Sequence, residues 1–262
     1  MVAADAKSQP LGLSSALVFL LLSLAITLPL GVLLYTFGLH EQHDGLMIIV
    51  QLSSWALLTL FLVRFYRSDP KQAYAITASP NAWMLLGSGL GLTMGWFPSW
   101  LVSRLDEHFQ NVNLGQLEAL EEIFSSGAAS QRIWLFVAVV IVAPLCEELI
   151  FRGFLWRCLQ STLGPLGTLF VTSLLFAVYH IEPLHIIGVL PIGVILGILR
   201  LGSKSIVPGI LAHLLNNLIG AGLAAGLFFG EQTATSTAVA LSSALVTLTL
   251  IGLAWWWHKR KV

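Results

Sequence analysis

Eight apolar stretches, each long enough to cross a lipid bilayer, occupy most of this 262-residue chain. They lie at residues 11–37, 45–63, 82–103, 133–158, 165–181, 184–200, 205–229 and 234–257. A membrane-spanning helix needs roughly 17–25 apolar residues. Only helices and closed barrels satisfy their backbone hydrogen bonds in lipid, and these stretches lack the period-two alternation of barrel strands. The sequence therefore predicts an all-α fold, a polytopic membrane helical bundle of about eight transmembrane helices.

The composition agrees with a bilayer as the surroundings of this chain. Hydrophobic residues make up 56% of it and charged residues 10%, whereas a soluble domain carries about 25% charged residues. We therefore expect the membrane lipid bilayer as a partner, and no nucleic acid.

The basic residues are distributed unevenly between the two sides of the predicted bundle. If the amino terminus is cytoplasmic, 11 of the 13 lysines and arginines lie on or near the inner side, and only Arg104 and Arg132 lie outside. Cytoplasmic loops of membrane proteins are enriched in lysine and arginine. We therefore expect an integral membrane protein with both termini in the cytoplasm.

An acidic pair, Glu147 and Glu148, lies inside the fourth apolar stretch. A charged side chain at this depth costs about 2.5–3.5 kcal/mol on insertion scales, and such residues usually face the bundle interior and serve function. Glu148 and Arg152 have the i, i+4 spacing that pairs side chains on one helix face. Glu147 lacks such a neighbour and needs a partner from another helix.

Two histidines and an asparagine are the candidates for the rest of the site. The Gly and Pro of Leu163-Gly164-Pro165 predict a turn, and a hairpin about that turn brings His180 to the level of Glu147. His213 lies in the seventh stretch, and Asn217 shares its helix face at i+4. We therefore expect polar groups from three helices to meet at one depth.

These residue types suit hydrolysis by an activated water molecule. A carboxyl group in apolar surroundings binds its proton more tightly than in water, which suits Glu147 to act as a general base beside His180. His213 and Asn217 offer N–H donors for an oxyanion. No serine, threonine or cysteine is evidently paired with a base. Glutamate and two histidines could instead bind zinc, although the spacing is not the His-Glu-x2-His of zincins.

Other polar or reactive residues have simpler interpretations. Cys146 and Cys158 are about 18 Å apart along one predicted helix, so they cannot form a disulfide, and we expect both to fill apolar space. Asn216 should point to a different face from Asn217. An amphipathic helix is expected within the outer segment 104–132, with Leu114, Leu117, Leu120 and Ile123 on its apolar face. Four histidines are expected to be solvated at the outer surface, namely His40, His43, His108 and His185.

At the residues singled out above, the sequence resembles the CPBP family of intramembrane proteases, which includes type II CAAX prenyl endopeptidases and bacteriocin-processing proteins. The family pattern is Glu-Glu-x3-Arg, then Phe-x3-His, then His-x3-Asn. In this chain the three motifs are Glu147-Glu148…Arg152, Phe176…His180 and His213…Asn217. All three are intact and in order, and they cover roughly residues 133–220.

The resemblance implies an intramembrane endopeptidase that hydrolyses a peptide bond of a membrane-associated substrate. It implies that Glu147 and His180 activate water, that His213 and Asn217 line the oxyanion site, and that Glu148 and Arg152 support them. Members have been described both as metalloproteases and as metal-independent glutamate proteases, so zinc stays open as a cofactor. The substrate would be a prenylated CAAX-type or other lipidated protein, or a peptide precursor.

The apolar stretches and the resemblance together divide the chain into three segments and suggest its cellular location. Residues 1–132 would hold N-terminal transmembrane helices and the outer amphipathic segment, 133–220 the catalytic core, and 221–262 the C-terminal transmembrane helix with a basic tail. The chain looks like a bacterial relative, which places it in the plasma membrane. The alternatives are a proton-coupled membrane transporter, with the acidic and histidine residues as a relay, and a bacteriocin self-immunity protein. The clustering of the motifs and the lack of repeated halves argue against the transporter.

Overall fold

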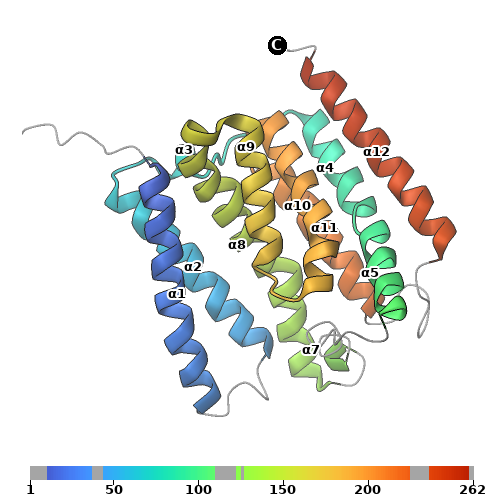
Figure 1. Ribbon diagram of the computed structural model, residues 1–262, viewed down its shortest axis with the longest axis horizontal. Helices are drawn as coiled ribbons and strands as arrows, with labels where there is room; N and C mark the ends of the chain where they lie inside the picture. Colours follow the sequence, from blue (N-terminus) through green and yellow to red (C-terminus); the bar gives the residue numbers. More distant parts are fainter. Residues whose placement is uncertain (1–10, 37–43, 110–121, 125–126, 225–235, 260–262) are drawn as a thin grey trace, which may run out of the picture.

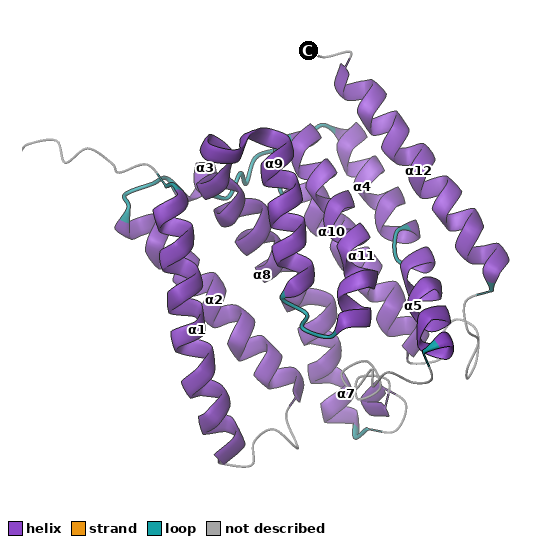
Figure 2. Cartoon of the chain, viewed as in Figure 1, coloured by secondary structure: helices purple, strands orange, loops and turns teal. Residues whose placement is uncertain are grey.

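The computed structural model describes residues 11–36, 44–109, 122–124, 127–224 and 236–259, and every regular element in these ranges is helical (Figures 1 and 2). The elements are α1 Leu13–Thr36, α2 Asp44–Phe65, α3 Pro70–Ala73, α4 Asn81–Thr93, α5 Trp96–His108, α7 Ala129–Phe136, η1 Val137–Val142, α8 Ala143–Glu147, η2 Glu148–Leu155, α9 Trp156–Val178, α10 Pro183–Ser203, α11 Val207–Ala224 and α12 Thr237–Lys259. The all-α class is confirmed, since the described residues contain no strand.

Five helical stretches are long and apolar enough to cross a membrane. They are Ile48–Phe65, Ala129–Val178, Pro183–Ser203, Val207–Ala224 and Thr237–Trp256. The apolar part of α1, Leu13–Pro29, is shorter. These helices support an integral membrane protein, while the predicted count of eight spans is not confirmed.

The predicted turn at Leu163-Gly164-Pro165 is confirmed. Gly164 has φ 66° and ψ 178° and interrupts α9, so the stretch Ala129–Val178 folds back into two legs. A positive φ of this size is easily adopted only by glycine. The turn therefore places the second leg, residues 165–178, against the helix that carries the acidic pair, and α9 does pack on η2.

The helices form one bundle with the motif-bearing elements at its centre (Figure 1). α1 and α2 lie on one side, α12 lies on the other, and α8 to α11 lie between them. α11 packs on α4, α10 packs on α9, and α2 packs on α7, η1 and α8. The largest fully buried side chains include Arg152, Phe154 and Phe176. The core of the bundle is therefore built around the motif residues.

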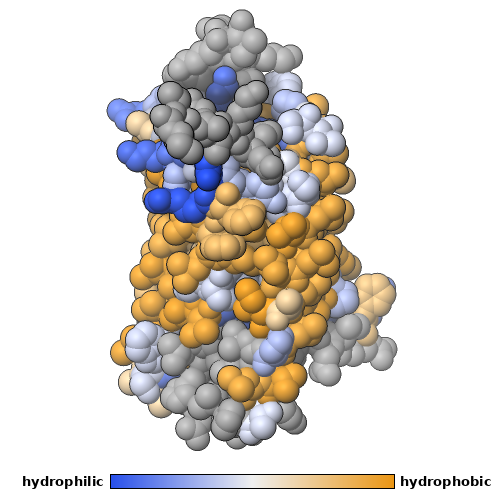
Figure 3. Space-filling model, turned by 90° about the vertical axis from the view of Figure 1, so that its left-hand side faces the viewer, coloured by the Kyte–Doolittle hydropathy of each residue, from blue (hydrophilic) through white to orange (hydrophobic). Residues whose placement is uncertain are grey.

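The surface of the bundle suits a bilayer. A band of hydrophobic residues crosses the face shown in Figure 3, with hydrophilic residues gathered above it. Large apolar side chains point outward on helices at both sides of the bundle, such as Leu21, Phe61 and Leu245. A soluble domain rarely exposes an apolar surface this extensive, so this band is the surface that lipid would cover.

The structure tests the expectation for the two cysteines, and it tests little of the expected amphipathic helix. Cys146 and Cys158 are both free and buried, which confirms that they fill apolar space. The amphipathic helix expected within 104–132 lies mostly outside the described residues, which include α5 up to His108 and, further on, Ile123.

Candidate active site

The helix that carries the acidic pair is not a regular α-helix. Six-residue η1 and eight-residue η2 are wide, π-helical turns on either side of the short α8. Pro144 stands in the first turn of α8 and cannot donate a backbone hydrogen bond, which favours a widened turn before it. Such π-turns often occur at functional sites. Here they set the directions of Glu147, at the end of α8, and Glu148, at the start of η2.

Four ionisable side chains are buried together at this place. Glu147 is 5% exposed, His213 3%, and Glu148 and Arg152 0%. Buried charges are tolerated when they are paired and hydrogen-bonded. The contacts of these four side chains therefore define the site.

His213 lies between the two glutamates. Its Nε2 is 3.6 Å from Glu147 Oε2, and its Nδ1 is 3.5 Å from Glu148 Oε1. Both distances are within ion-pair range and longer than a good hydrogen bond. One ring nitrogen therefore faces each carboxylate at ion-pair distance, and Nδ1 makes no hydrogen bond among the described residues.

Glu148 and Arg152 form the pair expected from their spacing. Arg152 Nη1 donates to Glu148 Oε1 at 3.0 Å, and Arg152 Nη2 donates to the Gly193 carbonyl of α10 at 2.9 Å. The guanidinium also lies 4.3 Å from the centre of the Phe176 ring. Arg152 is thus held by three elements, and Glu148 links it to His213.

A glycine on α11 lets this helix approach the buried pair. A Cβ atom at Gly209 would lie 2.7 Å from Glu148 Oε2. Real Cβ atoms essentially never come that close to another heavy atom. The position of Glu148 therefore depends on the absence of a side chain at residue 209.

The Gly209→Ala substitution is expected to push the Glu148 carboxylate away and to destabilise the protein by about 1–3 kcal/mol, the usual cost of overpacking. Thermal unfolding in detergent would measure it. Gly220→Ala is the matched control on the same helix, because a Cβ there would have nothing within 4 Å. The control should be neutral or slightly stabilising, since alanine is the better helix former. Equal stability of the two variants would contradict the close approach at Gly209.

His180 lies in the turn after α9 and is held by aromatic neighbours. Its Nδ1 is 2.8 Å from the Phe176 carbonyl, and because a carbonyl only accepts, Nδ1 is the donor. In the neutral ring this leaves Nε2 as an acceptor. The Phe176 ring touches both histidine rings, with centroids 5.2 Å from His180 and 5.7 Å from His213. No hydrogen bond or ion pair joins His180 to Glu147 in the described part of the chain, so the histidine beside Glu147 is His213.

The expectation that His185 is a solvated surface residue is wrong. The structure places its ring against His180, with centroids 4.7 Å apart, and the side chain is half-buried. The short turn between α9 and α10 brings the start of α10 back over His180, a contact that sequence spacing did not reveal. His108 is exposed as predicted, while His40 and His43 lie outside the described residues.

Asn217 lies on α11 one turn after His213 and is held at both ends of its amide. Its Nδ2 donates to the Val139 carbonyl of η1 at 2.9 Å, and Asn216 Nδ2 donates to its Oδ1 at 3.2 Å. Asn216 was expected to point elsewhere, and its contact with Asn217 was not predicted. Nδ2 carries two hydrogens, so one remains for another acceptor.

The described residues do not form a metal site. No group of three His, Cys, Asp or Glu side chains among them is arranged to hold a metal ion. His213 contacts both glutamates, but both nitrogens of its ring already face carboxylates. We therefore derive no step of the chemistry through a metal.

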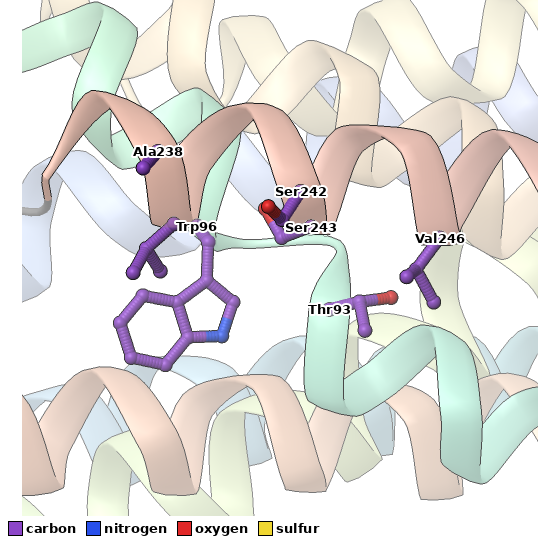
Figure 4. A pocket seen from close by; sticks show the side chains of 7 residues that line it. Thr93, Trp96, Ala238, Ser242, Ser243 and Val246 are labelled. Atoms are coloured by element: carbon purple, nitrogen blue, oxygen red, sulfur yellow. The ribbon is translucent and has the colours of Figure 1, made fainter.

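A pocket elsewhere in the bundle does not belong to this site. It has a volume of about 360 Å³ and lies where the break between α4 and α5 faces α12 (Figure 4). Its lining residues are Thr93, Trp96, Ala238, Val239, Ser242, Ser243 and Val246. None of these is a residue of the three motifs.

Part of the chain matches a known protein family. Residues 129–219 match the family model described as "Type II CAAX prenyl endopeptidase Rce1-like". This segment contains all three motifs and confirms the resemblance drawn from them. No curated protein and no solved structure gives a significant match to the chain.

Proposed function

We propose, from the match of residues 129–219 to type II CAAX prenyl endopeptidases, that this protein is an intramembrane endopeptidase. It would hydrolyse a peptide bond of a membrane-associated substrate with water activated by Glu147 and His180. The observation that carries the proposal is the buried cluster of Glu147, His213, Glu148 and Arg152 inside the matched segment. A purely structural bundle has no need of such an arrangement in lipid.

The first chemical step would use Glu147 as a general base. Its carboxylate takes a proton from water, and the hydroxide oxygen adds to the substrate carbonyl carbon. His180, with Nδ1 fixed on the Phe176 carbonyl, presents Nε2 as an acceptor that orients the same water. Proton transfer of this kind contributes about 10²–10⁴-fold to a rate.

The oxyanion that follows would be stabilised from α11. Asn217 keeps one Nδ2 hydrogen beyond its bond to Val139 and would donate it to the oxyanion. His213 lies one turn earlier on the same helix, and because its ring nitrogens face Glu147 and Glu148, it would hold these carboxylates in position. The intermediate collapses when the peptide C–N bond breaks and protonated Glu147 returns its proton to the leaving amine. Glu148 and Arg152 take no proton in this scheme and hold His213 and the backbone in place.

The length of the second leg of α9 indicates how deep His180 would lie in the bilayer. Residues 165–178 span about 21 Å at 1.5 Å per residue, whereas the hydrocarbon core is about 30 Å thick. The turn that carries His180 would therefore lie within the membrane. Irregular backbone at that depth is tolerated where it lines a water-filled cavity or is buried in protein.

The substrate class and location follow from the same proposal. The substrate would be a prenylated CAAX-type or other lipidated protein, or a peptide precursor, that reaches the site from the bilayer. Residues 133–220 would be the catalytic core between an N-terminal unit, 1–132, and a C-terminal helix with its basic tail, 221–262. We place the protein in a bacterial plasma membrane with both termini in the cytoplasm.

Peptide cleavage by the purified protein tests the proposal. A panel of fluorogenic peptides, with and without a prenyl group, would be assayed in detergent and in liposomes, and we expect cleavage of at least one class. Proton-coupled solute flux without cleavage would instead support the transporter. If the protein showed neither cleavage nor solute flux, the self-immunity protein would be favoured.

Activity is expected to survive removal of metal ions, because no metal-binding group is arranged among the described residues. The measurement compares cleavage before and after a strong chelator, with metal analysis of the same sample. Zinc present at one equivalent, and lost together with activity, would contradict this expectation.

A further inference from the structure

The helix before the acidic pair leaves one carbonyl without a partner along its own backbone. In η1, Ala143 N–H donates to the Ala138 carbonyl, five residues back. Val139 would accept from Ala143 in an α-helix and from residue 144 in a π-helix. The N–H of Ala143 already donates to Ala138, and residue 144 has no N–H because it is proline.

A side chain from another helix supplies the missing donor. Asn217 Nδ2 donates to the Val139 carbonyl at 2.9 Å, although the two residues are 78 positions apart in the sequence. This bond, together with the one from Asn216, fixes the plane of the Asn217 amide. The direction of its remaining N–H is thereby fixed too.

We propose that Pro144 is a positioning residue, which withholds an N–H from Val139 and so reserves that carbonyl for Asn217. An alanine at 144 would bring a backbone N–H to the same carbonyl and compete with Asn217. The amide of Asn217 would then keep only the bond from Asn216, and its orientation would be less tightly fixed. The catalytic consequence rests on the proposed function, whereas the competition for Val139 does not.

A stability cycle tests the competition without any assay of activity. Asn217→Ala in the natural background leaves the Val139 carbonyl unpaired and should lower Tm by about 2–4 °C. In the Pro144→Ala background the new N–H takes the place of the lost donor, so the same substitution should lower Tm by less than about 1 °C. Pro144→Ala alone should not lower Tm, because it restores a helix hydrogen bond. An equal loss in both backgrounds, or unfolding of both Pro144→Ala and Pro144→Ser, would overturn the proposal.

Kinetics test the consequence for catalysis. Pro144→Ala should lower kcat roughly tenfold and leave KM within about twofold, because only part of the stabilisation by one oxyanion donor is lost. The double variant Pro144→Ala with Asn217→Ala should be no slower than Asn217→Ala alone. Multiplicative effects of the two substitutions, or a change confined to KM, would overturn the positioning role.

Pro29→Ala is the matched control, since Pro29 is an exposed proline inside α1 and away from the site. It should leave kcat and the Tm effect of Asn217→Ala unchanged. If the natural protein cleaves no peptide, the proposed function fails, while the stability cycle still decides whether Pro144 reserves the Val139 carbonyl. The two failures are therefore distinguishable.

Discussion

The Glu147→Gln substitution is expected to abolish peptide hydrolysis while the protein stays folded. Glutamine keeps the size of the side chain and its capacity for hydrogen bonds but cannot take a proton from water. General bases contribute about 10²–10⁴-fold, and Glu147 is the buried carboxylate of the pair that lacks an arginine partner. The measurement is kcat on a cleavable peptide, together with Tm of the same preparation.

Glu107→Gln provides the matched control for Glu147→Gln. Glu107 lies on α5 in an exposed ion pair with Arg104, and such surface pairs contribute little to stability. We expect its activity and Tm to equal those of the natural protein. Activity of Glu147→Gln above about one tenth of the natural rate would rule out Glu147 as the general base.

Loss of the buried charge pair should give the largest change in stability. Glu148→Gln leaves Arg152 uncompensated at a position where neither side chain is exposed, and breaking such a pair typically costs about 3–5 kcal/mol. In a chain of this length the fall in Tm should be on the order of 10 °C. Thermal or denaturant unfolding in detergent would measure it.

A double substitution distinguishes support from chemistry at Glu148. Glu148→Gln with Arg152→Met removes both charges and keeps apolar volume, so part of the lost stability should return. Arg152→Met alone should be about as damaging as Glu148→Gln. A well-folded Glu148→Gln protein that is as inactive as Glu147→Gln would show that Glu148 takes part in the chemistry and does not merely hold Arg152.

Contacts within one helix, and turns with a strong local signal, could be predicted from the sequence. The spacing of Glu148 and Arg152 gave their ion pair, since residues at i and i+4 face each other on a helix. Gly164 gave the hairpin turn, because its conformation is one that glycine adopts readily. The apolar stretches gave the helical bundle, because lipid admits few other structures.

Contacts between helices were decided only by the tertiary structure. The sequence paired Glu147 with His180, whereas the structure puts His213 between Glu147 and Glu148 and the Phe176 ring between the two histidines. Helical spacing could not show this, because the π-turns η1 and η2 rotate the side chains that follow them away from 3.6-residue periodicity.

Some residues near the site could not be identified from the sequence, because their roles depend on contacts seen only in the folded chain. His185 reaches the site because the start of α10 approaches His180 in space. Asn216 reaches it because its amide donates to the neighbouring Asn217 on the same helix. Val139 has no unusual side chain. Its carbonyl accepts from Asn217 where neither Ala143, which donates to Ala138, nor Pro144 supplies a backbone N–H. The sequence by itself determined that the chain is a helical membrane bundle and which residue types are available for the proposed chemistry. The tertiary structure decided which of them touch, because the rotation and approach of packed helices depend on contacts far apart in the chain.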